Sequence, residues 1–261
     1  MPIIQAVDRA LRILDLFDEH HTELKITDIS NRIGLHKSTV HSLLKTLQAH
    51  GYIEQNPENG KYKLGLKLVE RGNLVLNSLD IRTVAKRHLL DLSHQTGLTV
   101  HLVILDGKEG VYIDKVEGTS GVVMYSRIGR RVPIHSSAVG KVLVAFQSQE
   151  VIRDILDGYE FVPHTPNTIT NERDFLMELE KVRSLGYAID NQENEPGVQC
   201  VAVPVRDHLG QVAAAISMSS PVVGIQKERL EHMIVLLKQT ADEVSRKLGY
   251  GIHPQKHDLT I

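Results

Sequence analysis

The hydrophobic periodicity of the sequence changes near residue 98, and this change constrains the fold more than any other feature. Before it, apolar residues recur every three or four positions, as they do on one face of a helix. After it, strand-like apolar runs bounded by glycines are interspersed with helix-like segments. Strands and helices that do not alternate strictly favour an antiparallel sheet. The pattern therefore predicts an α+β chain, and 261 residues leave room for about two domains.

The first part of the chain is expected to form three short helices and a hairpin. The stripe of the first helix consists of Ile4, Val7, Leu11, Leu14 and Phe17. Thr27 is the expected N-cap of a second helix that ends at Gly34. The third runs from about His36 to His50 and turns Val40, Leu43, Leu44 and Leu47 inward. Two extended runs then flank Asn59-Gly60, a strong hairpin signal.

The second part is expected to form an antiparallel sheet with helices. The strands are expected at residues 99–106, 111–117, 121–128, 187–190, 198–205 and 211–219. The helices are expected at residues 80–96, 138–146, 149–156, 171–182 and 226–248. The domain boundaries that follow are a first domain at 1–65, a linker helix at 66–80, a second domain at 81–250 and a tail at 251–261.

Composition places the chain among ordinary globular proteins and indicates its compartment. It is 41% apolar and 24% charged, and it contains a single cysteine, so an internal disulfide is impossible. No apolar run approaches the length of a membrane-spanning helix, and no secretory signal is visible at the N-terminus. We therefore expect a cytoplasmic protein that does not interact with membranes.

A net charge of −2 conceals a local basic surface. Residues 34–53 contain two lysines and three histidines but no acidic residue. If the apolar side of the third helix is buried, the outward side chains are Lys37, Ser38, His41, Ser42 and Lys45. A helix of this kind fits the major groove of DNA, and Lys61 and Lys63 of the hairpin would reach the neighbouring backbone. The competing interpretation is a merely solvated polar face, but the hairpin and the absence of acids favour DNA.

Several segments, in order along nearly the whole chain, resemble the IclR family of bacterial transcription regulators. They are residues 26–47, 51–54, 62–66, 135–141, 190–195, 197–205 and 215–219. The resemblance implies a winged helix-turn-helix that binds a double-stranded DNA operator through Lys37, Ser38, Thr39, His41, Ser42, Lys45, Lys61 and Lys63. The family commonly has an arginine where this chain has Ser42, so recognition is expected to depend more on the other residues.

The residues of the second part also suggest a small-molecule pocket. Residues 136–140 open a helix, and the free N–H groups of a helix N-terminus attract carboxylates. Lys141, just inside that helix, either extends to the surface or approaches an anion. Asp190, Cys200, Ser217 and Ser219 share one face if the strands alternate. These groups suit a small organic acid, although small residues are equally what close helix-to-sheet packing requires.

The resemblance implies that the second domain is a GAF-like, effector-binding sensor. Its implied ligand shell is Gly121, Met124, Ala138, Val139, Asp190, Val198, Cys200, Ser217 and Ser219. Ala138 stands where some members have glycine, which narrows the opening. The expected protein is a regulator that forms a homodimer and then a homotetramer, and whose operator binding responds to a carboxylate effector.

The alternative function is an enzyme, either metal-dependent or based on a nucleophilic cysteine or serine. His135, Asp190 and Cys200 are residue types that ligate metals or form catalytic groups. They lack the short spacing of a metal motif, and the chain contains no nucleophile elbow, phosphate loop or His-Glu-x-x-His pair. We therefore expect neither catalysis nor a cofactor. A purely structural role would leave the basic helix and the hairpin unexplained.

Overall fold

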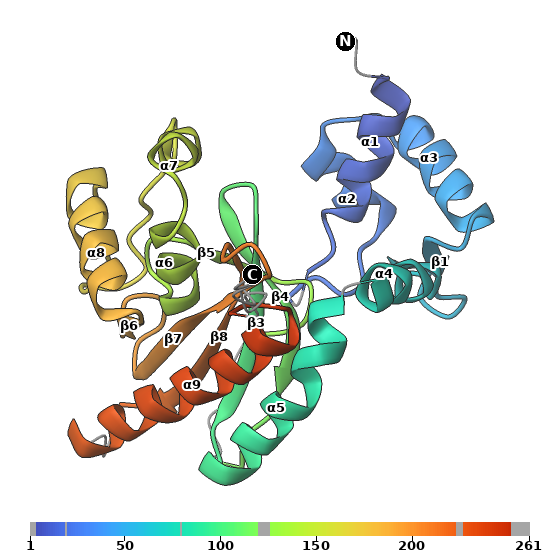
Figure 1. The fold of residues 1–261 in the computed structure, drawn as a ribbon. Helices are drawn as coiled ribbons and strands as arrows, with labels where there is room; N and C mark the ends of the chain where they lie inside the picture. The colour runs from blue at the N-terminus through green and yellow to red at the C-terminus, as the bar shows by residue number, and fades with distance from the viewer. Residues whose placement is uncertain (1–3, 19, 79, 120–125, 223–226, 252–261) are drawn as a thin grey trace, which may run out of the picture. The chain divides into compact units, whose positions relative to one another are not determined.

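The computed structural model describes residues 4–18, 20–78, 80–119, 126–222 and 227–251. For residues 75–78, 80 and 227 it describes the backbone and not the side chains. The chain divides into two compact units, which Figure 1 shows in ribbon form. Unit 1 comprises residues 1–78 and unit 2 comprises residues 79–261. Each unit has its own hydrophobic core, so each is described by itself.

The described residues of unit 1 form three helices, a two-stranded antiparallel hairpin and a fourth helix, which confirms the expected winged helix-turn-helix. Its elements are α1 (Gln5–Leu14), α2 (Ile26–Ile33), α3 (Lys37–Ala49), β1 (Ile53–Gln55), β2 (Tyr62–Leu64) and α4 (Lys67–Ser78). In the hairpin Ile53 pairs with Leu64. The buried core contains Ile13, Leu24, Ile29, Ile33, Val40, Leu44, Ile53 and Tyr62.

The start of α2 differs from the sequence prediction. Thr27 lies inside the helix, and the N-cap is Lys25, whose backbone N–H donates to Asp28 Oδ2 at 3.3 Å. An acidic residue in the third helical position can therefore satisfy the backbone at the N-terminus without a capping hydroxyl. The predicted end is correct, because Gly34 adopts the left-handed conformation (φ 73°) that favours glycine.

The first part of the apolar stripe of α1 faces solvent, whereas Leu14 and Phe17 at its end are partly buried against the core of unit 1. Ile13 is the fully buried residue of this helix, whereas Ile4, Val7 and Leu11 are 70%, 54% and 56% exposed. Helical spacing thus identifies an apolar stripe without identifying what covers it. An exposed row of large apolar side chains is typical of a surface that packs against another protein.

The described part of unit 2 forms a six-stranded sheet in which every pair of neighbouring strands is antiparallel, as the sequence predicts. The strands follow the spatial order β5-β4-β3-β8-β7-β6. They are β3 (Thr99–Asp106), β4 (Glu109–Val116), β5 (Arg131–Pro133), β6 (Ala188–Asn191), β7 (Val198–Arg206) and β8 (Val212–Pro221). The helices are α5 (Asp80–Thr96), α6 (Ala138–Ala145), α7 (Gln149–Leu156), α8 (Glu172–Leu185) and α9 (Lys227–Lys247).

Helices cover both faces of this sheet (Figure 1). One face packs against α5 and α9 through a core that includes Leu89, Val201 and Leu237. The other packs against α6, α7 and α8 through a second core that includes Leu143 and Phe175. The expected α+β class is therefore confirmed, with α6 placed directly on the sheet.

The edge of the sheet differs from the prediction. Of the strand expected at residues 121–128, residues 121–125 lie outside the described residues, and residues 126–128 are not in a strand. One edge of the described sheet is β5, which the sequence did not predict and which pairs with β4. A three-residue strand with an arginine and a proline is typical of a sheet edge, but it is too short and too polar to produce a hydrophobic period.

Candidate functional site

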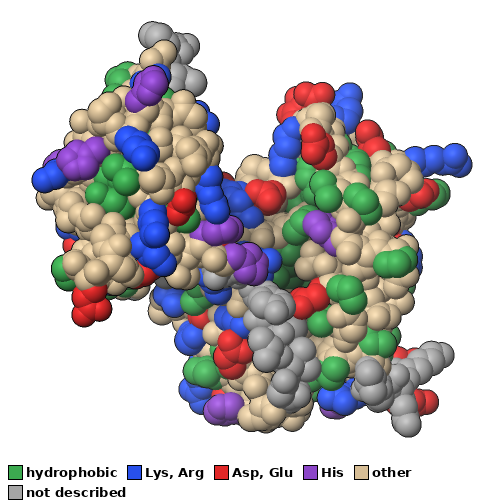
Figure 2. Space-filling view, turned by 180° about the vertical axis from the view of Figure 1, so that it is seen from behind, with side chains coloured by type: hydrophobic (Ala, Val, Ile, Leu, Met, Phe, Trp, Pro, Cys, Tyr) green, Lys and Arg blue, Asp and Glu red, His purple; other side chains and the backbone are tan. Residues whose placement is uncertain are grey.

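The polar face of α3 is exposed, as the sequence predicts. Val40 and Leu44 on the opposite side are completely buried and fix the rotation of the helix. The solvent-facing set contains the exposed Lys37, Ser38, His41, Ser42 and Lys45 and the half-buried Thr39. Figure 2 shows Lys, Arg and His side chains gathered on the visible face of the unit drawn at its left, which is unit 1. The α3 face therefore offers two ammonium groups and several short hydrogen-bonding groups to a polyanion.

Internal hydrogen bonds along α3 set what its hydroxyl groups can do. Ser42 Oγ donates to the Ser38 carbonyl oxygen at 3.1 Å, and Thr46 Oγ1 donates to the Ser42 carbonyl oxygen at 3.0 Å. The Ser42 hydroxyl therefore donates its hydrogen bond within the helix, but its oxygen keeps lone pairs that can accept one. On this face the lysines and His41 are the groups best suited to contact phosphates and base edges.

The hairpin brings its own acidic partners, which the sequence reasoning missed. Lys63 Nζ lies 3.2 Å from Glu54 Oε2, and its hydrogen bond holds the pKa of Glu54 below its usual range. Glu23 accepts hydrogen bonds from the side-chain amides of Asn59 (3.1 Å) and Asn56 (3.4 Å). Lys61 is half-buried. The two hairpin lysines are therefore weaker candidates for DNA contacts than the lysines of α3.

A cavity of about 510 Å³ in unit 2 brings together most of the expected effector residues. Seven of the nine line it, namely Ala138, Val139, Asp190, Val198, Cys200, Ser217 and Ser219. The other two, Gly121 and Met124, lie outside the described residues. The alternation along β7 and β8 thus points Cys200, Ser217 and Ser219 to one side, as expected.

The N-terminus of α6 forms one wall of this cavity. Ser137 caps the helix by accepting from the Gly140 N–H at 3.1 Å, and its hydroxyl donates to the Pro133 carbonyl oxygen at 2.6 Å. A Cβ at Gly140 would lie 2.4 Å from Ile134 Cα, so only glycine permits this packing. The N–H groups of Ala138 and Val139 stand in the first turn, where a helix supplies them with no partner of its own. This wall is suited to an anionic group.

Burial shifts the pKa values of Asp190 and His101, which both line the cavity. Asp190 is 3% exposed, and burial raises its pKa to about 7, although its Oδ1 accepts from the N–H groups of Glu193 (2.6 Å) and Asn194 (3.3 Å). Burial, and then the charge of Lys115, lowers the pKa of His101 to about 3. His101 Nε2 pairs with Ser126 Oγ at 2.7 Å. His101 is therefore an uncharged hydrogen-bonding group at physiological pH.

The remaining polar lining mixes uncharged groups with the charged side chains of Glu109, Arg130, Arg131 and Glu195. Burial raises the pKa of the Cys200 thiol and of the Tyr112 hydroxyl, and Cys200 Sγ lies 3.1 Å from Ser219 Oγ. The half-buried Arg130 supplies a cation, and its charge opposes the rise in pKa that burial causes at Glu195. The cavity thus combines guanidinium groups and a helix N-terminus with carboxylates and neutral donors and acceptors. These features suit a small polar anion.

Family models match both units of the chain. The model described as the IclR helix-turn-helix domain matches residues 6–57, and the model described as the bacterial transcriptional regulator IclR C-terminal domain matches residues 73–246. The chain belongs to the IclR family. As an IclR-family protein, it is a DNA-binding transcriptional regulator with an effector-binding C-terminal domain.

Relatives and solved structures agree with this family. The transcriptional regulator XynR of Escherichia coli is 54% identical over 96% of this chain and 99% of its own length. The Thermotoga maritima IclR structure is 40% identical, with a TM-score of 0.77 over 94% of this chain and 99% of that one. An IclR homologue from Microbacterium hydrocarbonoxydans, in complex with 4-hydroxybenzoate, is 26% identical, with a TM-score of 0.80 over 93% and 98% of the chains.

The enzyme alternative fails on the geometry of this IclR-family domain as well as on its relatives, which are regulators. His135 does not line the cavity with Asp190 and Cys200. Its Nδ1 pairs with the Tyr159 hydroxyl at 2.7 Å, and its Nε2 pairs with the Val162 carbonyl oxygen at 3.0 Å. Among the described residues no group of three or more His, Cys, Asp or Glu side chains is placed to hold a metal ion. His135 is thus a structural residue.

The sequence reasoning missed several polar groups of this IclR-family domain. His101, Tyr112 and Arg130 line the cavity, but nothing in the spacing of the strands distinguishes them from core or surface residues. Lys141 does not extend to the surface, because it is 1% exposed and lies 2.6 Å from Glu193 Oε1. The unfavourable position of the Lys141 charge near a helix N-terminus was the sequence signal that could have indicated its buried anionic partner.

No helix in the described segments is both long and apolar enough to span a membrane.

Proposed function

We propose that this regulator binds its operator through the α3 face and that an organic acid in the unit 2 cavity modulates this binding. The observation that carries the proposal is the lining of the cavity, where Arg130 and the α6 N-terminus lie among hydrogen-bonding groups such as Tyr112, Ser217 and Ser219. The relative in complex with 4-hydroxybenzoate supports an organic acid, because that ligand carries a carboxylate on a small body.

At the operator, the roles of the side chains follow from their position on α3. Lys37 and Lys45 would contact phosphates, and Ser38, Thr39 and His41 would contact base edges, which their position on the solvent-facing side of α3 supports. Ser42 contributes an acceptor, and Lys61 and Lys63 are placed to contact the backbone beside the hairpin.

Selection of genomic fragments bound by the purified protein supplies the operator for a direct test. A Lys37→Ala, His41→Ala, Lys45→Ala triple variant is expected to lose about 100-fold or more in affinity for that fragment. It should keep its unfolding temperature, because all three side chains are exposed. Unchanged operator binding by the triple variant would refute the assignment of α3.

The effector is proposed to occupy the cavity lined by Ala138, Val139, Asp190, Val198, Cys200, Ser217 and Ser219, with Gly121 and Met124 completing the shell. Its carboxylate would accept from the α6 N-terminus and from Arg130. A thermal-shift screen of organic acids should find a compound that stabilises the protein. The gain should disappear in Asp190→Ala and Ser217→Ala. Equal stabilisation of these variants would place the ligand elsewhere.

The functional assembly is proposed to be a homodimer that pairs further into a homotetramer. The exposed stripe of Ile4, Val7 and Leu11 on α1, together with α4, is the proposed contact between two copies of unit 1. Two copies would present two α3 helices to two half-sites. Sedimentation of Val7→Lys should show a smaller assembly than that of the wild type. A variant that sediments like the wild type would exclude this stripe.

Communication between the two sites is proposed to pass along the linker at residues 66–80, between a DNA-binding domain at 1–65 and an effector domain at 81–250. The effector can shift DNA affinity only if it binds one arrangement of the domains better than another. Because the operator is part of the bacterial chromosome, the protein is proposed to act in the cytoplasm.

A further inference from the structure

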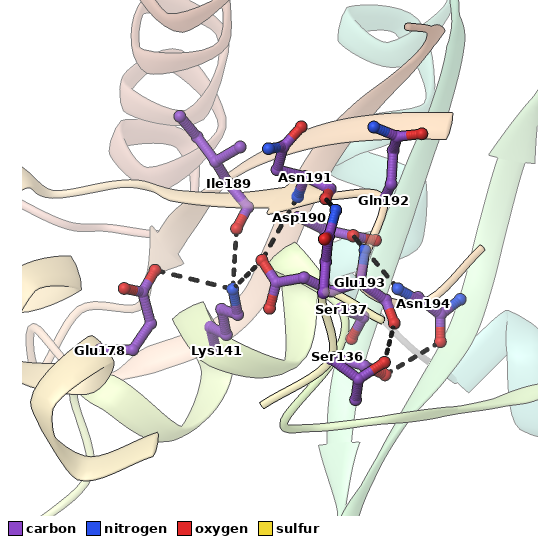
Figure 3. Close-up of polar contacts among 12 residues, drawn as sticks. Ser136, Ser137, Lys141, Glu178, Ile189, Asp190, Asn191, Gln192, Glu193 and Asn194 are labelled. Atoms are coloured by element: carbon purple, nitrogen blue, oxygen red, sulfur yellow. Dashed lines mark hydrogen bonds and ion pairs between the residues drawn. The ribbon is translucent and has the colours of Figure 1, made fainter. Parts of the chain in front are cut away.

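Two walls of the effector cavity are fastened to each other by contacts that lie outside the cavity. One wall is the N-terminus of α6, and the other is the β6–β7 segment, defined here as residues 190–195. The segment contributes Asp190, Asn194 and Glu195 to the lining. Figure 3 shows the side chains of α6 that reach across to this segment. The shape of the cavity therefore depends on what holds these walls together.

Lys141 is the main contact between the walls. It lies in the first turns of α6, and its Nζ donates to Glu193 Oε1 at 2.6 Å and to the Ile189 carbonyl oxygen at 2.9 Å (Figure 3). Glu178 Oε1 of α8 lies 3.6 Å away. Lys141 and Glu193 are 1% and 8% exposed, and neither lines the effector cavity. The ammonium group thus joins three elements from behind the cavity wall.

Glu193 in turn determines the path of the β6–β7 segment. Its N–H donates to Asp190 Oδ1 at 2.6 Å, and its carbonyl oxygen accepts from the Thr168 hydroxyl at 2.6 Å. The preceding Gln192 has φ of 60°, a left-handed conformation that costs a non-glycine residue free energy. A second contact, from Ser136 Oγ to Asn194 Oδ1 at 3.1 Å, joins the segment to the start of α6. The segment is held in a strained path by these bonds.

The electrostatics of Lys141 argue that it does more than fill space. A cation near a helix N-terminus opposes the helix dipole, and burial of an ion pair costs desolvation free energy that an apolar pair would not. Well-packed apolar residues could therefore stabilise the same fold at lower cost. Apolar residues could not donate hydrogen bonds to the Glu193 carboxylate and the Ile189 carbonyl oxygen, as Lys141 does.

We propose that Lys141 and Glu193 are positioning residues of the effector cavity, which hold Asp190 and Asn194 against the N-terminus of α6. Loss of the pair lets the β6–β7 segment move away and opens the cavity beside Cys200, which pairs with Asp190 across β6 and β7. The consequence for effector affinity rests on the proposed function, whereas the opening of the cavity does not.

Cys200 allows a test that needs no effector, because it is the only cysteine of the chain and lines the cavity. Methyl methanethiosulfonate converts its thiolate into a methyl disulfide and releases methanesulfinate. In the wild type, burial and the neighbouring Asp190 raise the pKa of the thiol, so the reaction is slow. In Lys141→Ala the segment is released, and the rate should rise about tenfold or more.

The structure also provides a rescue experiment. A surface depression of about 370 Å³ is lined by Lys141, Glu178, Glu193 and Gln199, so a small cation can reach the position of the missing ammonium group. Ethylammonium chloride should return the Lys141→Ala rate close to that of the wild type, whereas sodium chloride should not. Global destabilisation alone would not respond to the identity of the cation.

Two further variants complete the experiment. Lys181 lines the same depression but is 64% exposed and pairs with Glu178, so Lys181→Ala is the matched control and should leave the Cys200 rate unchanged. If Lys141→Ala does not fold, Lys141→Met with Glu193→Gln removes both charges and should still show the faster reaction.

The proposal is overturned if a folded variant that lacks the Lys141 ammonium group reacts at the wild-type rate, or if ethylammonium fails to slow Lys141→Ala. Because no effector is added, either outcome leaves the proposed function intact. Conversely, failure to find an organic-acid ligand would leave this result standing.

Discussion

The α3 face and the unit 2 cavity are both polar, but the side chains of one are exposed to water and many of those of the other are buried. Lys37, His41 and Lys45 are exposed side chains on a helix whose far side is packed. In the cavity, burial shifts the pKa values of Asp190 and His101 in opposite directions, and each makes specific hydrogen bonds. Substitutions on α3 should therefore change DNA affinity without changing stability, whereas substitutions around the cavity should change stability.

The largest difference is expected between two lysines, one behind the cavity and one on α3. Lys141→Met leaves the Glu193 carboxylate buried without its cation, which should cost about 3–5 kcal/mol in the free energy of unfolding. Lys45→Met, on an exposed face, should cost less than about 0.5 kcal/mol. Urea unfolding measures both. Similar losses for the two variants would remove the contrast between the sites.

The second prediction concerns the pH dependence of Asp190. Its pKa is raised from 3.8 to about 7, so between these values the folded state holds a proton that the unfolded state has released. Stability from this group is therefore present at low pH and is lost as the pH rises through about 7.

Asp190→Asn removes this titration while keeping an oxygen that can accept from Glu193 and Asn194. Relative to the wild type, the variant should gain about 2 kcal/mol between about pH 5 and pH 8 in unfolding experiments. A stability difference that does not change with pH would show that Asp190 is ionised throughout this range. The difference in unfolding free energy between Lys45→Ala and the wild type should not change over this pH range, because both proteins contain Asp190.

The third prediction separates the roles within the α3 face. Lys45→Ala should weaken binding by a similar factor on all DNA sequences and reduce the salt slope by about 1. His41→Ala and Ser38→Ala should instead change discrimination between bases by about 1–3 kcal/mol. Binding titrations on the selected fragment and its single-base variants, at several salt concentrations, measure both quantities. A uniform effect of His41→Ala would make it a phosphate contact.

The smallest effect is expected at the hairpin. Lys63 already pairs with Glu54, so part of its charge is neutralised before DNA arrives. Lys63→Ala should therefore lower the affinity and the salt slope less than Lys45→Ala does. Glu54→Gln should increase affinity slightly by releasing Lys63. An effect of Lys63→Ala equal to that of Lys45→Ala would assign the hairpin an equal share of the phosphate contacts.

The same contrast between the two sites shows which of their residues can be predicted from the sequence. On α3 the buried Val40 and Leu44 have helical spacing, so the exposed residues follow by geometry. In the cavity, strand alternation predicts the shared face of Cys200, Ser217 and Ser219. It cannot predict His101, Tyr112 or Arg130, because a polar residue that faces a cavity has the same local pattern as one that faces the core or solvent.

Pairings between distant residues were also beyond the reach of local patterns. Lys141 and Glu193 are brought together by the packing of α6 against β6, and nothing near Lys141 in the sequence indicates its partner. The apolar stripe of α1 shows the same limit, because its spacing is clear but does not reveal that Ile4, Val7 and Leu11 are exposed. Periodicity therefore predicts faces, whereas the tertiary fold determines their partners.

The most direct test of the account is the operator affinity measured with and without an organic acid found in the thermal-shift screen. The wild type should change its affinity for the selected fragment by about tenfold when the acid is added. Asp190→Asn with Arg130→Gln should bind the fragment normally but no longer respond to the acid. A response of equal size in this cavity variant would contradict the claim that the effector acts from the unit 2 cavity.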